Sequence, residues 1–157
     1  MALTELLSRL LLATALGAAL GMERELRRKP AGLRTNILIA LGSAIFTIVS
    51  IEFGRDGGTP DRIASQIVTG VGFLGGGAIL RRGVNVRGMT TAVTVWVNAA
   101  IGMAAGGGYL ALATIGTILT LFVLAVLPAI ESGFERRAGI DYRTTHPERR
   151  DKSGKAT

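Results

Sequence analysis

The stretch Thr-Gly-Val-Gly-Phe-Leu-Gly-Gly-Gly at residues 69–77 decides between two folds for this chain. Gly70, Gly72 and Gly75 have the GxGxxG spacing of a dinucleotide-binding turn, which needs a strand before it, a helix that opens at the third glycine and an acidic residue about 20 positions later. Here an apolar run precedes the glycines and ends only at Arg81, and residues 94–96 are Thr-Val-Trp. This context argues against nucleotide binding and favours the interior of an apolar helix.

Placed on a helix, residues 63–78 divide into two faces. One face carries small and polar residues at spacings of three and four, and the opposite stripe carries branched apolar residues. The small and polar face consists of Ser65, Thr69, Gly72 and Gly76, with Gln66, Gly70 and Gly77 beside it. Small residues let neighbouring helices approach closely in lipid.

A matching series, Ala13, Gly17 and Gly21, lies in the first apolar segment. We predict that Gly17, Gly21 and the glycines at 70, 72 and 75–77 pack helices together, either next to each other in one chain or across a dimer axis. The alternative is that the missing side chains leave a cavity lined by Gln66 and by carbonyls freed at local helix breaks.

Five apolar segments make up most of the chain: residues 3–22, 35–53, 63–80, 89–105 and 109–130. Each is near the ~20 residues that a helix needs to cross a hydrocarbon layer of ~30 Å. The chain is 48% hydrophobic with 22 glycines and only 5% aromatic residues, a composition that indicates a membrane protein. We therefore predict an all-α, integral membrane bundle of about five transmembrane helices in a domain at residues 1–130. Glu5 and Arg9 interrupt the first segment, so we expect a retained helix there and not a cleaved signal peptide.

Basic residues predict the orientation, because cytoplasmic loops collect Lys and Arg. Of the 18 basic residues, 15 lie in the first loop, the third loop and the tail, which an odd number of spans places on one side. We predict that the N-terminus is outside and the C-terminus is cytoplasmic. Residues 131–157 are expected to form a flexible basic tail that rests on anionic headgroups or is simply solvated. The net charge of +7 does not indicate nucleic-acid binding, because no aromatic residues are interleaved with the basic ones.

Charged residues gather at the predicted cytoplasmic ends of several spans. They form a candidate network that either pins helix ends together or serves as a partner-docking or gating surface: Glu23, Arg24, Glu25, Arg34, Arg81 and Arg87. Asp61 precedes the third span, where it is expected to cap the helix or to attract cations at an outer mouth. Asp61 and Glu23 are the weak candidates for holding a metal ion.

Polar residues inside the spans need partners or water. The candidates for helix–helix contacts, or alternatively for a polar path, are Gln66, Thr69, Thr91, Thr94 and Asn98. The chain has no cysteine, and its single histidine, His146, lies in the tail. Without a base beside a nucleophile or a pair of buried carboxylates, the sequence predicts neither an enzyme nor a bound cofactor.

The motifs, in their order and spacing, resemble the membrane domain of the MgtC/SapB family. The matching strings are GMEREL at 21–26, RKPAGLRTN at 28–36, LGSAIF at 41–46, DRIASQIVTGVGFLGGGAILRRG at 61–83 and VRGMTTAVTVW at 86–96 followed by AAIGMAAGGG up to residue 108. Asn36 departs from a frequent histidine of the family and Gly76 from its usual alanine. Many relatives carry a cytoplasmic domain after the spans, and we expect the tail of this chain to be too short to supply one.

The resemblance implies a bacterial inner-membrane protein of magnesium homeostasis, needed for growth under magnesium limitation and, in pathogens, for survival inside phagocytes. It also implies a regulator that acts through membrane partners such as the ATP synthase. We therefore expect a non-enzymatic protein, bound in the lipid bilayer as a homo-oligomer, that modulates other membrane proteins. The alternative is a transporter or channel for Mg²⁺ or another small cation or solute.

Overall fold

The computed structural model describes residues 1–55, 59, 62–82 and 85–138. Asp61 and the tail residues 139–157 lie outside this part of the chain. The chain divides into two units, Met1–Leu121 and Phe122–Thr157, which are described separately below.

The described residues form five helices and one short hairpin, so the predicted all-α bundle is confirmed. The elements are α1 (Leu3–Leu26), α2 (Leu33–Arg55), α3 (Arg62–Gly77), β1 (Leu80–Arg82), β2 (Asn85–Arg87), α4 (Met89–Gly106) and α5 (Leu110–Ala138). Four helices are long and apolar enough to cross a membrane within this part of the chain: α1, α2, α4 and the section Leu110–Pro128 of α5.

The third helix is shorter than the apolar segment at 63–80, because α3 ends at Gly77. The amides of Ala78 and Ile79 donate to the carbonyls of Gly75 and Gly76, three residues back, which is the tightened last turn of a helix. Each glycine in a helix interior is about 1 kcal/mol less favourable than alanine, so a run of three glycines favours the end of a helix. The predicted third loop, between the apolar segments at 63–80 and 89–105, contains a short hairpin instead. Its strands β1 and β2 are antiparallel, with Arg81 paired to Val86.

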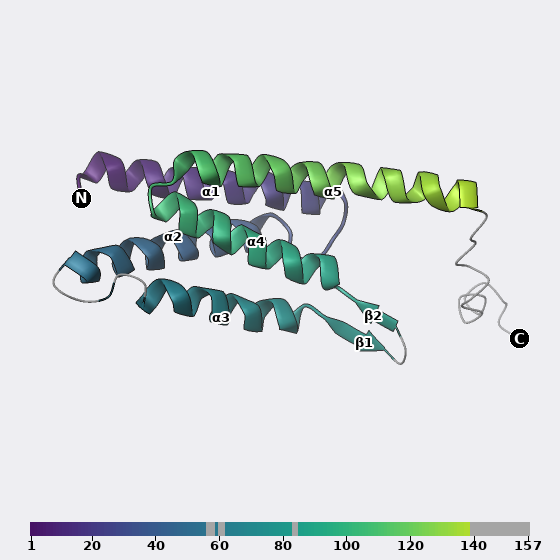
Figure 1. Cartoon of the computed structure of the whole chain (residues 1–157), viewed down its shortest axis with the longest axis horizontal. Helices are drawn as coiled ribbons and strands as arrows, with labels where there is room; N and C mark the ends of the chain where they lie inside the picture. The colour runs from purple at the N-terminus through teal and green to yellow at the C-terminus, as the bar shows by residue number, and fades with distance from the viewer. Residues whose placement is uncertain (56–58, 60–61, 83–84, 139–157) are drawn as a thin grey trace, which may run out of the picture. The chain divides into compact units, whose positions relative to one another are not determined.

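Within the first unit, α2 and α4 occupy the centre (Figure 1). They contact each other, and each also contacts α1 and α3. Successive helices run in opposite directions, so the α1–α2 connection, the hairpin and the start of α4 share one end of the unit. Ala113 and Thr117, near the start of α5, are buried in this unit, and Gly116 lies beside Ile101 of α4.

The centre of the unit is held by direct contact between helix backbones. A Cβ atom added at Gly17 of α1 would lie 2.8 Å from the carbonyl oxygen of Asn36, and one added at Gly21 would lie 2.7 Å from the Cα atom of Leu33. On α4, a Cβ atom at Gly106 would lie 2.5 Å from the carbonyl oxygen of Ala44, and one at Gly102 would overlap that of Ala40. Glycine and alanine therefore let α1 and α4 both touch the backbone of α2.

Gly88 joins the hairpin to α4 and has a backbone conformation that side chains rarely adopt, with φ of 92°. A Cβ atom there would also overlap the carbonyl oxygen of Ala78, at the end of α3. Two independent constraints therefore require glycine at the turn into α4.

In the second unit, the described residues continue α5 from Phe122 to Ala138. Pro128 lies inside this section of the helix. A proline cannot donate a backbone hydrogen bond, so the section is weakened at this point without being ended there.

We predict that Gly102→Ala lowers the free energy of unfolding by roughly 1–3 kcal/mol, because its methyl group would force α4 away from α2. Gly42→Ala is the matched control, since Gly42 lies inside α2 and nothing lies within 4 Å of an added Cβ atom. Unfolding of both variants in detergent, titrated with a denaturing detergent, measures the difference. Equal stability of the two variants would contradict the close α2–α4 contact.

Candidate functional site

A pair of asparagine side chains links α2 to α4 in the core of the first unit. Asn36 and Asn98 are both 0% exposed. The Nδ2 atom of Asn98 donates to the backbone oxygen of Asn36 at 2.7 Å and to its Oδ1 atom at 3.1 Å, while Nδ2 of Asn36 donates to the carbonyl of Gly32 at 3.0 Å. The Oδ1 atom of Asn98 has no hydrogen-bond partner among the described residues. Asn98 is thus an interhelical contact, one of the two roles that its sequence position allowed.

Sequence reasoning missed Asn36, which stands only two positions into the second apolar segment. The sequence did contain a signal for this contact, because both helices carry an asparagine followed by small residues at intervals of four. Asn36, Ala40 and Ala44 on α2 face Asn98, Gly102 and Gly106 on α4, so that each series begins with an amide and continues with small residues.

A buried arginine joins α1 to the same face of α4. Arg24 is 4% exposed, and its NH2 atom donates to Oγ1 of Thr91 at 2.8 Å. Its Nε atom has no hydrogen-bond partner in the described part of the chain. Because Thr91, Thr94 and Asn98 follow one another at spacings of three and four, they lie on one face of α4. We call Arg24, Asn36, Thr91, Thr94 and Asn98 the polar core.

The other charged residues of the predicted cytoplasmic network do not join Arg24, and only Glu23 and Glu25 have local partners among the described residues. Glu23 pairs at 2.6 Å with Arg27, the residue that follows α1, and Oε2 of Glu25 accepts a hydrogen bond from the amide of Leu33 at 3.2 Å, at the start of α2. Arg34 is exposed, and it makes no hydrogen bond or ion pair with the residues that the structure describes. Arg87 is exposed on β2, and only the backbone of Arg81 is described.

Nothing in the described residues supports either of the two candidate metal ligands, Glu23 and Asp61. Glu23 is engaged with Arg27, and Asp61 falls outside the described residues. Over residues 1–55, 59, 62–82 and 85–138, histidine, aspartate and glutamate form no group of three or more side chains.

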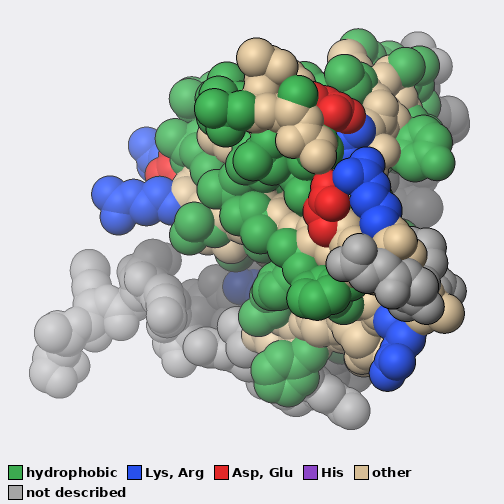
Figure 2. All heavy atoms as spheres, turned by 90° about the vertical axis from the view of Figure 1, so that its left-hand side faces the viewer, with side chains coloured by type: hydrophobic (Ala, Val, Ile, Leu, Met, Phe, Trp, Pro, Cys, Tyr) green, Lys and Arg blue, Asp and Glu red, His purple; other side chains and the backbone are tan. Residues whose placement is uncertain are grey.

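The opposite end of the first unit has its own charged contacts, which sequence reasoning did not anticipate. Arg9 pairs with Glu5 and donates to the carbonyl oxygen of Gly106 at 2.8 Å, at the end of α4. A cation at a helix C-terminus is favoured by the helix dipole, so this contact ties α1 to α4. Glu52 pairs with Arg55 at 2.9 Å on α2. Figure 2 views this end and shows acidic and basic side chains next to one another among hydrophobic ones.

A groove of about 1050 Å³ runs between α2 and α3 and reaches the first residues of α4. We call it the α2–α3 groove. Of the residues predicted to form a polar path, it brings together only Gln66 and Thr91, while Thr94 and Asn98 lie in the polar core outside it. Arg34 and Thr35 line one end.

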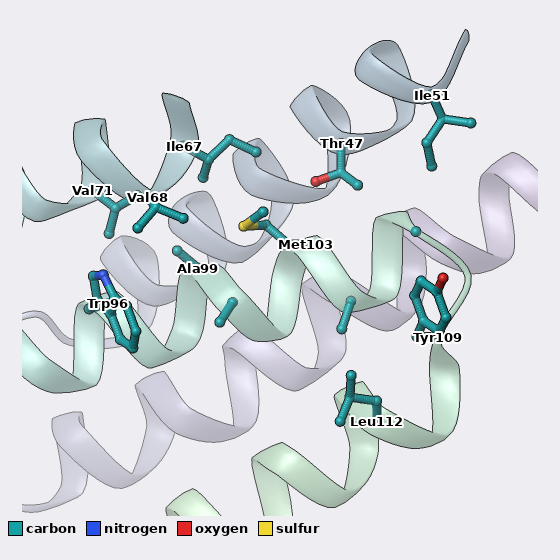
Figure 3. A pocket seen from close by; sticks show the side chains of 13 residues that line it. Thr47, Ile51, Ile67, Val68, Val71, Trp96, Ala99, Met103, Tyr109 and Leu112 are labelled. Atoms are coloured by element: carbon teal, nitrogen blue, oxygen red, sulfur yellow. The ribbon is translucent and has the colours of Figure 1, made fainter. Parts of the chain in front are cut away.

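A second groove, of about 560 Å³, is lined mainly by apolar residues of α2, α3, α4 and the start of α5 (Figure 3). Trp96 and Met103 of α4 lie across it from Ile67 and Val71 of α3. Thr47 of α2 lines this groove, and its hydroxyl group donates to the carbonyl of Ser43 at 2.8 Å. This groove offers little that could bind a polar ligand.

The glycines of α3 have three different surroundings. Gly75 packs against the backbone of Ala92 on α4, where an added Cβ atom would lie 3.3 Å from a carbonyl oxygen. Gly70 and Gly77 line the α2–α3 groove. Gly72 and Gly76 are exposed. At these two glycines, and also at Gly70 and Gly77, an added Cβ atom would have no neighbour within 4 Å. The series Gly17 and Gly21 contacts α2 and not α3.

An exposed strip on α3 remains outside both grooves. It consists of Ser65, Thr69, Gly72 and Gly76, all exposed in the first unit. We call it the α3 ridge. Sequence reasoning placed Thr69 both on this face and among the candidates for a polar path or helix–helix contacts, and Thr69 is exposed on the ridge.

A family model described as the MgtC family matches residues 10–132. The chain belongs to the MgtC family. The resemblance inferred from the motifs is therefore confirmed. Four of the described helices are long and apolar enough to span a bilayer, so this family member is a membrane protein.

Three relatives illustrate how far the similarity extends. The protein named "Putative magnesium transporter YhiD" of Escherichia coli K12 is 50% identical over 129 residues, which cover 78% of this chain and 60% of the relative. Protein MgtC of Salmonella typhimurium LT2 is 50% identical over 112 residues, 71% of this chain and 48% of its own length. Uncharacterized protein slr0014 of Synechocystis is 48% identical over 117 residues, 74% and 50% of the two chains.

The MgtC-family chain thus spans about half the length of the curated relatives that it matches. No solved structure matches the chain.

We predict that the two asparagines of the polar core are energetically coupled. A double-mutant cycle of Asn36→Ala and Asn98→Ala should give a coupling energy of about 0.6–1.7 kcal/mol, the range for interhelical hydrogen bonds in membranes. Unfolding in mixed detergent micelles measures it. A pairing of Asn98→Ala with Thr114→Ala is the control, because Thr114 donates only to Leu110 of its own helix, and should be additive. Additivity in both cycles would contradict the link between α2 and α4.

Proposed function

We propose that this MgtC-family chain is a non-enzymatic regulator in magnesium homeostasis that acts by binding other proteins in the bacterial inner membrane. The family and the magnesium transporter name of its Escherichia coli relative support the connection to magnesium. The resemblance suggests the ATP synthase as one partner.

The observation that carries this proposal is how the deep polar groups are used. Arg24 binds Thr91, and Asn98 binds Asn36, so these side chains join three helices to one another. Thr94 and Thr117 donate to carbonyls one turn back in their own helices. Groups engaged in this way hold the bundle together. The oxygen among them that has no hydrogen-bond partner in the described residues, Oδ1 of Asn98, falls far short of the octahedral set of ligands that Mg²⁺ requires.

The regulator needs a surface that a membrane partner can reach, and the α3 ridge has the right chemistry. Exposed hydroxyls at Ser65 and Thr69 lie beside glycines that leave room for the backbone of another helix. Small and hydroxyl-bearing residues are those on which helices associate in lipid. We place either a second copy of the chain, forming the homo-oligomer, or another membrane protein on this ridge.

The chain is proposed to lie in the inner membrane with its N-terminus outside. In this orientation the α1–α2 connection and the hairpin, with Arg28, Lys29, Arg34 and Arg87, are cytoplasmic. The positive-inside rule supports the assignment.

A transporter of Mg²⁺ or another small solute is the second candidate. The name of the Escherichia coli relative and the α2–α3 groove, with Gln66 and Thr91 in its walls, favour it. Thr94 and Asn98 do not line that groove, so the predicted polar path is not continuous along the described residues. This weakens the transporter hypothesis.

Magnesium flux separates the two candidates. We expect proteoliposomes that contain the purified chain to take up Mg²⁺, followed with an entrapped fluorescent indicator, no faster than empty liposomes. Asn98→Leu should reduce the yield of folded protein without altering flux. A Mg²⁺ flux that Gln66→Leu reduces, while the variant remains folded, would establish transport and overturn the proposal.

Partner binding tests the regulator directly. Purification from native membranes at native expression should recover a reproducible set of membrane proteins, and Gly72→Leu on the α3 ridge should reduce their recovery at least severalfold, because its side chain fills the space that a partner helix needs. Gly70→Leu is the matched control: it adds the same side chain to the same helix, also with nothing within 4 Å, but inside the α2–α3 groove. Recovery of no partner by the unaltered chain would contradict the proposal.

A further inference from the structure

The α2–α3 groove is mainly apolar, with Arg34 and Thr35 at one end and Gln66 near the other. Its walls include Leu38, Phe46, Ile63 and Leu74. Of these side chains, Leu38, Phe46 and Leu74 are each more than half exposed. Glycines at positions 42, 70 and 77 contribute no side chain, and nothing lies within 4 Å of the space that a Cβ atom would take. At about 1050 Å³, it lies just above the range of about 300–1,000 Å³ that is typical of ligand pockets.

One end of the groove carries an unneutralised positive charge. Arg34 is exposed there and has no hydrogen-bond or ion-pair partner among the described residues. No described lining residue is acidic. Arg34 stands in the first turn of α2, where the carboxylate of Glu25 already accepts a hydrogen bond from the amide of Leu33, so the charge that this end offers a ligand is the guanidinium group of Arg34 itself. The ligand that complements this end is an anion.

The length of the apolar section fits one leaflet of a bilayer. Arg34 and Phe46 of α2 are separated by about 18 Å at 1.5 Å per residue. On the antiparallel helix α3, Gly77 and Ile63 are separated by about 21 Å in the same way. Half of a bilayer with its headgroup regions is about 20–22 Å, so the groove runs from one membrane surface to near the midplane, with Gln66 one turn before its far end at Ile63.

We propose that the α2–α3 groove binds an anionic phospholipid, with an acyl chain lying between α2 and α3 and the phosphate group on Arg34. A zwitterionic lipid with the same chains gains the apolar contacts but offers the guanidinium group no net negative charge. The polar residues Thr35 and Thr91, which line the groove near this end, are within the region of the glycerol and ester groups. The site faces the same leaflet as the α1–α2 connection and the hairpin.

Lipid retention in native mass spectrometry tests this inference. The full chain, purified in detergent, is mixed with dioleoylphosphatidylglycerol or with dioleoylphosphatidylcholine, which share their acyl chains. We expect the chain to retain phosphatidylglycerol about fivefold more, the factor that one basic residue contributes near an anionic surface, and Arg34→Gln to remove the difference. Arg28→Gln is the charge control, because Arg28 is exposed in the same connection but does not line the groove.

Matched leucine substitutions test where the acyl chain lies. Gly42→Leu and Gly70→Leu place a side chain in open space inside the groove and should reduce retention of both lipids. Gly72→Leu and Gly76→Leu do the same on the α3 ridge and should leave retention unchanged. Thermal unfolding of each variant verifies that it is folded before retention is compared.

Three outcomes would overturn the proposal. The first is equal retention of the two phospholipids by the unaltered chain. The second is an equal loss for the groove and ridge variants. The third is that Gly70→Leu converts an oligomer into monomers without changing lipid retention, which would make the groove an interface between two copies of the chain. The test is independent of Mg²⁺ flux and of partner recovery, so the proposed function can fail while this inference holds.

Discussion

The close approach of three helix backbones at α2 is the constraint on which the first unit depends. Gly17 and Gly21 of α1 contact one side of α2, and Gly102 and Gly106 of α4 contact another, at Ala40 and Ala44. Lipid tails are as apolar as the side chains that they surround, so association in a bilayer relies on tight packing and hydrogen bonds. The absence of side chains on these faces brings α4 close enough to α2 for Asn98 to reach the backbone of Asn36.

The polar core follows from the same constraint. A buried asparagine or arginine is costly in hydrocarbon unless its hydrogen-bonding groups find partners. The backbone contacts fix the distances at which those partners occur, and Arg24 and Asn98 each use them only in part, since Nε of Arg24 and Oδ1 of Asn98 remain unpaired among the described residues. The chain thus combines a dense, hydrogen-bonded centre of α1, α2 and α4 with open surfaces along α3.

The helices of the bundle could be predicted because hydropathy and length report on the surrounding solvent, residue by residue. The family could be predicted because its motifs have a specific order. Which glycine contacts which helix could not, since Gly17, Gly70 and Gly102 are chemically identical and only their neighbours in space separate a packed seam from an open groove. Asn36 was missed for a similar reason: its place near the start of an apolar segment resembled a helix end, although its partner lies 62 positions away. The charged residues at 23–25 are consecutive in the chain, but helix geometry directs their side chains to different neighbours.

The shortness of α3 has a consequence for the surrounding lipid. Its 16 residues extend about 24 Å, against a hydrocarbon thickness of ~30 Å, whereas its neighbour α2 has 23 residues. A bilayer accommodates a short apolar segment by thinning next to it, at a cost of fractions of a kcal/mol per Å. The hairpin that follows Gly77 therefore draws the polar boundary inward beside α3 alone. A change in membrane thickness acts unequally on the two helices, so the α3 side of the bundle is the part whose energy depends most on the lipid composition of its membrane.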